Sequence, residues 1–212
     1  MEGNFDFNTI KDFDDHIDKS IPNYDVLLNC ILSISDYFIT KDTTIYDLGC
    51  STGKLLSMIK SNNKKIGYDD AKLMPTSTED IEYVKKDLNY KFEIKNSSLV
   101  YSIFTMQFLR RDKREEYCET IYNGLNKGGA FFLCEKIYQE SGLLQEMLSF
   151  AHYDYKCTHF SEEEIMHKER DLRYIMKPNT LQQNISLLNT AGFKNITQFW
   201  QSYNFIGLIA IK

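Results

Sequence analysis

The sequence predicts an α/β fold in which helices cover both faces of one doubly wound, mostly parallel sheet. A strand, a turn with two glycines and the start of a helix follow one another between residues 43 and 59. Strand-like and helical patterns alternate from residue 44 to residue 135, and residues 98–104 form an almost continuous apolar run. Such alternation is typical of parallel sheets, whose strands are apolar throughout because both of their faces are buried.

The N-terminal part of the chain predicts a helical cap before the first strand. Apolar residues recur every three to five positions over residues 5–24, and we expect this amphipathic segment to stop near Pro22. Residues 26–39 then show helical spacing. We therefore expect residues 1–40 to form a cap in which Tyr24 closes over a bound cofactor. The apolar residues of the first segment are Phe5, Ile10, Phe13 and Ile17.

The same patterns place the remaining elements in order. Strands are expected at residues 43–46, 65–70, 81–84, 98–104 and 130–135. Residues 112–126 predict a helix with Asp112 as its N-cap and an apolar stripe that ends at Leu125, before Gly128. Residues 136–190 predict a helical region for substrate or dimer contacts, without a strand signal over 140–190. Residues 197–203 and 205–211 predict a pair of strands at the C-terminus.

Composition limits the possible classes of protein. A chain of 212 residues with 42% hydrophobic and 14% aromatic residues is expected to fold as one domain, 1–212. A net charge of −5 argues against a broad phosphate-binding surface, so we expect no direct binding of nucleic acid. Without an apolar run long enough for a membrane helix, and without a signal-like N-terminus, we expect a cytoplasmic protein with no membrane contact.

The cysteines and histidines give no indication of a disulfide frame or a metal site. The five cysteines are odd in number and scattered without a C-x-x-C pair, which is typical of reduced thiols in a cytosolic enzyme. The four histidines show no H-x-x-x-H pair. We expect the chain to bind no metal.

The turn after the first strand carries the main functional signal. The sequence Asp47-Leu48-Gly49-Cys50-Ser51-Thr52-Gly53 ends a strand and starts a helix. Glycine at these two positions allows positive φ and leaves space for a ligand against the backbone. The spacing fits neither a P-loop nor the G-x-G-x-x-G fingerprint. The order acid, x, Gly, x, x, x, Gly resembles motif I of class I S-adenosylmethionine (SAM) dependent methyltransferases, although another α/β protein could use such a turn.

Further acids end the second expected strand and follow the third. Asp69 lies 22 residues after Asp47, and an acid about 20 residues on accepts hydrogen bonds from ribose hydroxyls in dinucleotide-type folds. A solvated turn residue is the alternative for Asp69. In SAM enzymes an acid after the third strand commonly faces the adenine ring, so the resemblance makes Asp87 a candidate partner of the exocyclic amine.

Several segments together resemble the carboxy-SAM synthase family over nearly the whole chain. This family converts SAM and prephenate to carboxy-SAM and phenylpyruvate for tRNA wobble-uridine modification. The generic motif is shared by many methyltransferases, whereas the segments 104–109 and 124–130 are much more specific. The matching segments are Phe5-Asp6, 20–24, 46–51, 104–109 (FTMQFL), 121–130 (IYNGLNKGGA), Glu135-Lys136, His152 with Asp154 and Lys156, 161–165 (SEEEI), 191–193 and Asn204-Phe205.

The resemblance implies a class I methyltransferase fold with an antiparallel last strand, and it implies the residues of the cofactor pocket. It also implies a homodimer. At two positions, however, the chain departs from the family. Ile103 stands where the family has Asn, beside the pocket. Glu169 stands where the family has an Arg that reaches into the neighbouring subunit. The implied SAM-pocket residues are Tyr24, Gly49, Cys50, Ser51, Asp69, Asp70, Asp87 and Leu88, to which the motif adds Asp47 and Gly53.

Glu169 decides between the functional interpretations. A guanidinium holds a carboxylate through two charge-assisted hydrogen bonds, whereas a glutamate repels it. We therefore expect first a SAM-dependent methyltransferase with a small-molecule acceptor. The alternative is carboxy-SAM synthesis, with Arg170 or Arg173 recognising the carboxylate. A SAM-binding protein without turnover is the third possibility. His152 is a candidate catalytic residue, and it could share a helix face with Lys156, four positions on.

Overall fold

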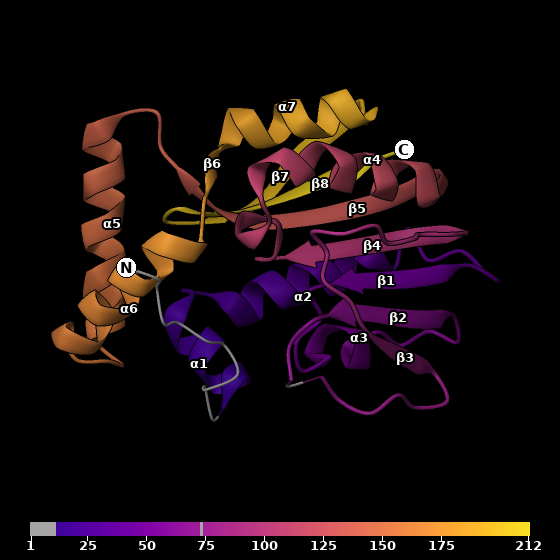
Figure 1. Cartoon of the computed structure of the whole chain (residues 1–212), viewed down its shortest axis with the longest axis horizontal. Helices are drawn as coiled ribbons and strands as arrows, with labels where there is room; N and C mark the ends of the chain where they lie inside the picture. Colours follow the sequence, from indigo (N-terminus) through magenta and orange to yellow (C-terminus); the bar gives the residue numbers. More distant parts are fainter. Residues whose placement is uncertain (1–11, 73) are drawn as a thin grey trace.

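An eight-stranded sheet forms the centre of the computed structural model, which describes residues 12–72 and 74–212 (Figure 1). Seven strands lie in the order β3-β2-β1-β4-β5-β8-β7, and β6 pairs with β5 beside this path. The strands from β1 to β5 pair in parallel, and β8 pairs antiparallel with both β5 and β7. The strands are β1 (Thr44–Leu48), β2 (Lys64–Asp69), β3 (Ile81–Lys85), β4 (Ser97–Ile103), β5 (Leu125–Tyr138), β6 (Asn179–Thr180), β7 (Asn195–Ser202) and β8 (Phe205–Ile211).

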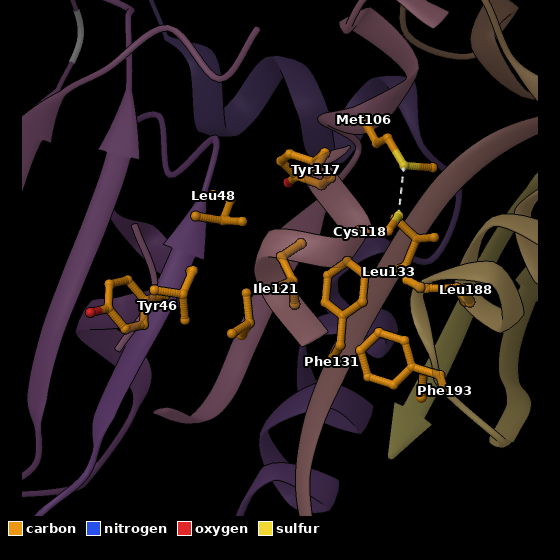
Figure 2. Close-up of a cluster of buried hydrophobic side chains, with 14 of the residues drawn as sticks. Tyr46, Leu48, Met106, Tyr117, Cys118, Ile121, Phe131, Leu133, Leu188 and Phe193 are labelled. Carbon is orange, nitrogen blue, oxygen red and sulfur yellow. Dashed lines mark hydrogen bonds between the residues drawn. The ribbon is translucent and has the colours of Figure 1, made fainter. Parts of the chain in front are cut away.

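Two apolar cores lie on the two faces of the sheet. On one face, α4 (Arg114–Gly124) and α7 (Leu181–Ala191) pack against β1, β4, β5 and β8 (Figure 2). On the other face, α2 (Tyr24–Ser35) and the single turn α3 (Lys54–Met58) cover the strands. Full burial of an aromatic side chain such as Phe131 stabilises the fold by roughly 1.5–3 kcal/mol. The predicted doubly wound sheet with an antiparallel last strand is confirmed.

Three further helices gather at one end of the sheet (Figure 1). They are α1 (Phe13–Ser20), α5 (Gly142–Cys157) and α6 (Glu162–Ile175). Helix α6 begins with a capping box, in which the side chains of Ser161 and Glu164 each accept a hydrogen bond from the other residue's backbone amide. The predicted apolar positions Phe5 and Ile10, and the family segment Phe5-Asp6, lie outside the described residues.

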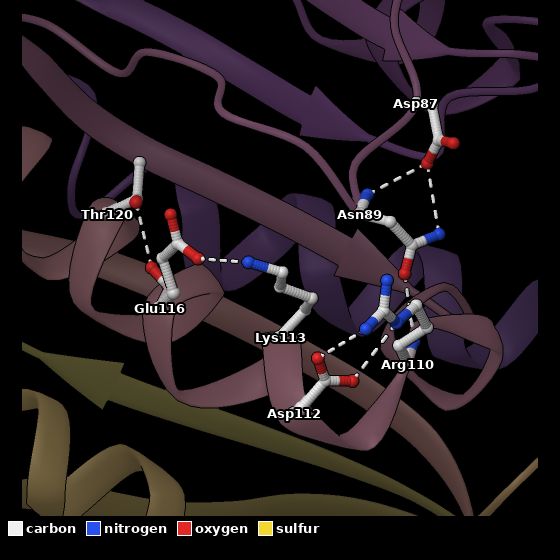
Figure 3. Close-up of polar contacts among 7 residues, drawn as sticks. All are labelled: Asp87, Asn89, Arg110, Asp112, Lys113, Glu116 and Thr120. Atoms are coloured by element: carbon white, nitrogen blue, oxygen red, sulfur yellow. Dashed lines mark hydrogen bonds and ion pairs between the residues drawn. The ribbon is translucent and has the colours of Figure 1, made fainter.

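The predicted helix 112–126 differs from the structure at both ends. Helix α4 begins at Arg114, and Asp112 is not its N-cap, because the Asp112 carboxylate accepts two hydrogen bonds from Arg110 at 2.6 and 3.1 Å (Figure 3). The helix ends at Gly124, where a side chain would collide with Ile94. Strand β5 already begins at Leu125, which pairs with Ser97 of β4, and Gly128 and Gly129 then exchange backbone hydrogen bonds with Lys212.

The region 140–190 contains the short strand β6 between its helices. Asn179 and Thr180 pair with Ile137 and Tyr138, where β5 extends past the sheet. Two residues are too few for a recognisable strand pattern, so tertiary pairing decides this element. Within residues 12–72 and 74–212, no helix has the length and apolar character needed to cross a membrane.

Candidate functional site

A cavity of about 520 Å³ opens at the carboxyl ends of the parallel strands. Its walls come from the turns after β1, β2 and β4, from the helices α1 and α2 on one side and from α5 and α6 on the other. Strand β1 lies between β2 and β4 at the point where the strand order reverses. Ligands of open α/β sheets bind at such a switch point.

The glycine turn after β1 lines this cavity through its first glycine. The amides of Gly49 and Cys50 donate to the carbonyl of Tyr68 at 2.7 and 3.2 Å, which ties the turn to β2. Gly49 has a φ of 84°, and a side chain there would collide with the side chain of Thr105. Gly53 does not line the cavity. Its φ is 74°, and it is needed because a side chain would strike the Tyr83 ring.

Asp69 joins two turns at the cavity wall. Its Oδ2 accepts the backbone amide of Ser51 at 2.7 Å, and its Oδ1 accepts the amide of Ala71 at 2.8 Å. Each carboxylate oxygen has two lone pairs, so the group can still accept hydroxyl donors from a ligand. Asp69 is therefore held in a fixed position by the two loops that frame the predicted ribose site. A freely solvated turn residue would not have these two contacts.

Asp47 is a buried acid at the end of β1. Burial, together with the nearby charge of Asp69, raises the pKa of the Asp47 carboxyl to about 8. Burial also raises the pKa of the Cys50 thiol and, to a lesser degree, that of Asp70. The site thus gathers acidic groups whose charged forms are disfavoured by burial. A cationic ligand would stabilise these charged forms.

The loop after β3 is fixed by a small hydrogen-bond network. Oδ1 of Asp87 accepts from the backbone and side-chain amides of Asn89 at 2.8 and 3.0 Å, and Asn89 in turn accepts the backbone amide of Arg110 (Figure 3). This network presents Asp87 and the buried Leu88 to the cavity. The predicted pocket residues that line it are Tyr24, Asp47, Gly49, Cys50, Ser51, Asp69, Asp70, Asp87, Leu88 and Ile103.

The other end of the cavity contains a buried charge cluster on β5, α5 and α6. The carboxylate of Glu169 is paired with Lys156 through Oε1 at 2.8 Å and with Lys136 through Oε2 at 3.6 Å. Burial alone would raise the pKa of Glu169, but the two ammonium groups outweigh it and lower the pKa to about 2. Lys168 also lines the cavity, where its ammonium contacts Nε2 of His16.

His152 and Lys156 share the inner face of α5, as their spacing predicted, and Asp154 is exposed. Nε2 of His152 lies 2.9 Å from the carbonyl oxygen of Ser20, which can only accept, so this nitrogen carries the proton. Burial and the charge of Lys156 lower the pKa of His152 to about 3. The imidazole is therefore neutral at physiological pH and positioned by α1.

The two arginines predicted for carboxylate recognition lie elsewhere. Arg170 and Arg173 are exposed and do not line the cavity of this chain. Glu169 occupies the inward position, so its neighbour Arg170 faces another way. Sequence reasoning did not find Lys136, Lys168 and His16 as cavity residues. The available signals were a histidine and a lysine on the amphipathic helices α1 and α6, and a lysine near the end of the buried strand β5.

The fold and the site define a class of protein. The structure of human N-acetylserotonin methyltransferase in complex with SAM is similar, with a TM-score of 0.61 and 18% identity, over 89% of this chain and 52% of that one. A putative O-methyltransferase from Nostoc punctiforme has a TM-score of 0.61 and 12% identity, over 88% of this chain and 57% of that one. The chain spans little more than half of each. The architecture is that of class I SAM-dependent methyltransferases.

Sequence relatives define the family within that class. The carboxy-SAM synthase of Staphylococcus epidermidis is 34% identical over 215 residues, covering 96% of this chain and 94% of that protein. The carboxy-SAM synthase of Shewanella baltica is 35% identical over 224 residues, covering 98% of this chain and 92% of that protein. No protein-family profile matches the chain. The chain belongs to the carboxy-SAM synthase family.

This membership confirms the predicted class of SAM-dependent transferase, with SAM as the cofactor of the family. It also makes the first functional prediction, a methyltransferase with a small-molecule acceptor, wrong, because the curated relatives are named carboxy-SAM synthases. That prediction treated Glu169 as an isolated negative charge. In the structure its carboxylate is paired with two lysines, so the repulsion expected for an anion is offset.

Proposed function

We propose that this chain is a carboxy-SAM synthase that converts SAM and prephenate to carboxy-SAM and phenylpyruvate. In the balanced reaction, a carboxyl group leaves prephenate as CO2 and bonds to the methyl carbon of SAM, which loses a proton. Prephenate also loses hydroxide as its ring becomes aromatic, and that proton and hydroxide form water. The observation that carries the proposal is similarity to carboxy-SAM synthases over nearly the whole length of both chains.

The residues of the cavity fit SAM. Asp69 would accept the ribose hydroxyls, and Asp87 with Leu88 would hold the adenine, since all three line the cavity. The turn at Gly49 offers an open backbone to the methionine part, and Asp47 supplies a buried acid near a cationic group. When bound, SAM supplies an acidified methyl group on a sulfonium.

The chain's own residues then orient the reactants and exclude water. Tyr24 on α2 lies beside Phe104, with ring centroids 6.3 Å apart, and together they form an aromatic wall after β4. Helices α1 and α5 are tied across the cavity by the hydrogen bond from His152 to Ser20. Holding both reactants in such a shielded site is the main contribution of a protein to this kind of transfer.

The proposed assembly is a cytoplasmic homodimer of one domain per chain, with small-molecule substrates and without direct nucleic-acid contact. Support for the dimer comes from α5, where Leu143 is 67%, Met147 57% and Phe150 67% exposed. These residues lie on one apolar stripe, at i, i+4 and i+7. An exposed stripe of this kind is typical of an interaction surface. In such a dimer, Arg170 and Arg173 could face the partner's cavity.

Incubation of the purified protein with SAM and prephenate, followed by mass spectrometry, tests the proposal. The expected product is heavier than SAM by the mass of CO2, and it requires both substrates. Omission of prephenate is the matched control. Binding of SAM without any new product would instead support a protein that has lost turnover, and formation of S-adenosylhomocysteine without carboxy-SAM would overturn the proposed reaction.

A further inference from the structure

The segment 104–109, which follows β4, forms part of the cavity wall. Side-chain atoms of Thr105 occupy the space that a side chain at Gly49 would need, so this residue packs directly against the glycine turn. The ring of Phe104 lies 6.3 Å from that of Tyr24 and 5.7 Å from that of Phe205, measured between centroids. The backbone path of this segment therefore sets the shape of the wall beside the turn. Its cavity-lining residues are Phe104, Thr105, Gln107, Phe108 and Leu109.

Phe104 has a backbone conformation that bulky residues rarely adopt. Its φ is 57°, in the left-handed region. Residues strained in this way persist only where the surrounding structure holds them, and they cluster at functional sites. The backbone amide of Phe104 donates to the carbonyl of Cys134 at 2.7 Å, and its carbonyl accepts Nε2 of Gln107 at 3.4 Å. The peptide groups on both sides of the strained residue are thus held by hydrogen bonds.

Gln107 connects the segment 104–109 to three other elements. Its side chain is buried, and Oε1 accepts the backbone amide of Lys136 on β5 at 2.8 Å. Its carbonyl oxygen accepts the backbone amide of Lys177, which follows α6, at 2.9 Å. The same oxygen accepts Nη2 of Arg114 on α4 at 3.1 Å. A change at Gln107 therefore alters the position of the wall relative to β5, α4 and the end of α6.

Arg114 holds the same segment from the first turn of α4. The residue is 1% exposed, and its Nε and Nη2 donate to the carbonyl of Leu109 at 3.2 and 3.0 Å. Its Nη1 donates to Oδ1 of Asn179 on β6 at 2.9 Å. Burial lowers the pKa of Arg114, and the charge of Glu135 on β5 acts in the opposite direction. A buried guanidinium is costly unless its donors are satisfied, so this residue favours the path of the segment that supplies the carbonyl acceptors.

The apolar residues of α4 already pack this helix onto the sheet, through Tyr117, Cys118 and Ile121 (Figure 2). The hydrogen bonds of Arg114 go instead to the cavity wall and to β6. We propose that Gln107 and Arg114 are positioning residues for SAM, which act by holding the segment 104–109 against the turn at Gly49. The inference rests on the proposed placement of SAM beside this turn, but it does not depend on the reaction that follows.

Titration calorimetry with S-adenosylhomocysteine, well below the melting temperature, measures this role without turnover. The substitution Gln107→Met keeps a side chain of similar length but removes the donor to Phe104 and the acceptor for the Lys136 amide. We expect about tenfold weaker binding, as for a buried polar group left without its partner. Ile121→Val, which shortens a buried side chain on α4, is the matched control. It should lower the melting temperature and leave the affinity unchanged.

Arg114 does not line the cavity, so an effect of its replacement on affinity must be transmitted through the protein. Arg114→Lys keeps the positive charge, but one ammonium cannot serve Gln107, Leu109 and Asn179 together. We expect about tenfold weaker binding of S-adenosylhomocysteine. If this variant does not fold, Asn179→Leu, which removes the acceptor of Nη1, replaces it with an expected loss in the same direction.

The double variant tests whether both residues act through one segment. Residues of one hydrogen-bond network are not additive, so Gln107→Met combined with Arg114→Lys should bind within about threefold of the weaker single variant. A loss of about a hundredfold, the product of the single effects, would indicate independent roles and overturn the inference. A lower melting temperature with unchanged affinity in both single variants would also overturn it, since a purely structural network predicts that result.

The outcome separates this inference from the proposed function. Weaker binding of S-adenosylhomocysteine in the variants, with no carboxy-SAM formed by the unaltered protein, would support the positioning role and reject the reaction. Carboxy-SAM formation by the unaltered protein, with unchanged affinity for S-adenosylhomocysteine in both single variants, would support the reaction and reject the positioning role.

Discussion

Replacement of Asp69 by asparagine changes the charge at the predicted ribose site with little change in shape. In the structure the carboxylate accepts the amides of Ser51 and Ala71 at 2.7 and 2.8 Å. An asparagine retains one acceptor oxygen and turns its NH2 group toward the other amide, so one of these hydrogen bonds is lost. A hydrogen bond to a charged group contributes roughly 1.5–3 kcal/mol, and the half-exposed position of Asp69 favours the lower part of that range.

The ribose hydroxyls would lose a charged acceptor in the same variant. We therefore expect Asp69→Asn to weaken binding of S-adenosylhomocysteine by about tenfold or more, which corresponds to about 1.4 kcal/mol. Calorimetry measures the affinity, and thermal melting checks that the turn between β1 and α3 still folds. Asp80→Asn, at an exposed aspartate before β3, is the control and should bind normally. An affinity for Asp69→Asn within threefold of the unaltered protein would refute the assigned role.

Three further predictions concern the turn, the buried acid and the exposed helix. Gly49→Val should abolish S-adenosylhomocysteine binding in calorimetry, because φ of Gly49 is positive and the added side chain collides with Thr105. Normal binding by this variant would show that motif I is misplaced. Binding of cationic SAM should release a proton from Asp47, because a nearby positive charge lowers the raised pKa of this carboxyl. The affinity for SAM should therefore rise with pH up to about 8 and level off above it. Calorimetry in buffers of different ionisation enthalpy checks this, and Asp47→Asn should abolish the pH dependence. Phe150→Glu should convert a homodimer to monomer in sedimentation, whereas an unchanged mass would place the interface elsewhere.

The sheet, and the edge of it where the first glycine and the acids meet, could be predicted because their signals are local. Continuous apolar runs mark the buried parallel strands, and the turn at Gly49 must combine positive φ with close packing. Asp69 ends β2 and Asp87 follows β3, and the carboxyl ends of these two strands meet at one edge, so the proximity of the two acids follows from the topology. These residues line one cavity in the structure.

The remaining features depend on contacts between distant parts of the chain. The start of β5 at Leu125 depends on pairing with Ser97 of β4, and β6 depends on pairing with Ile137. Gly53 also has a positive φ, but only the structure shows that it packs against Tyr83 and does not line the cavity. The charge of Glu169 could be read from the sequence, whereas its two lysine partners could not, because they come from other elements.

Transfer of a carboxyl group from prephenate to SAM is the reaction that we propose for this chain. Prephenate labelled with carbon-13 in its ring carboxyl group, incubated with SAM and the protein, tests this transfer by mass spectrometry and NMR. We expect the label in the new carboxyl group of carboxy-SAM and none in phenylpyruvate. Carboxy-SAM without label, or a labelled product with no carboxy-SAM, would contradict it.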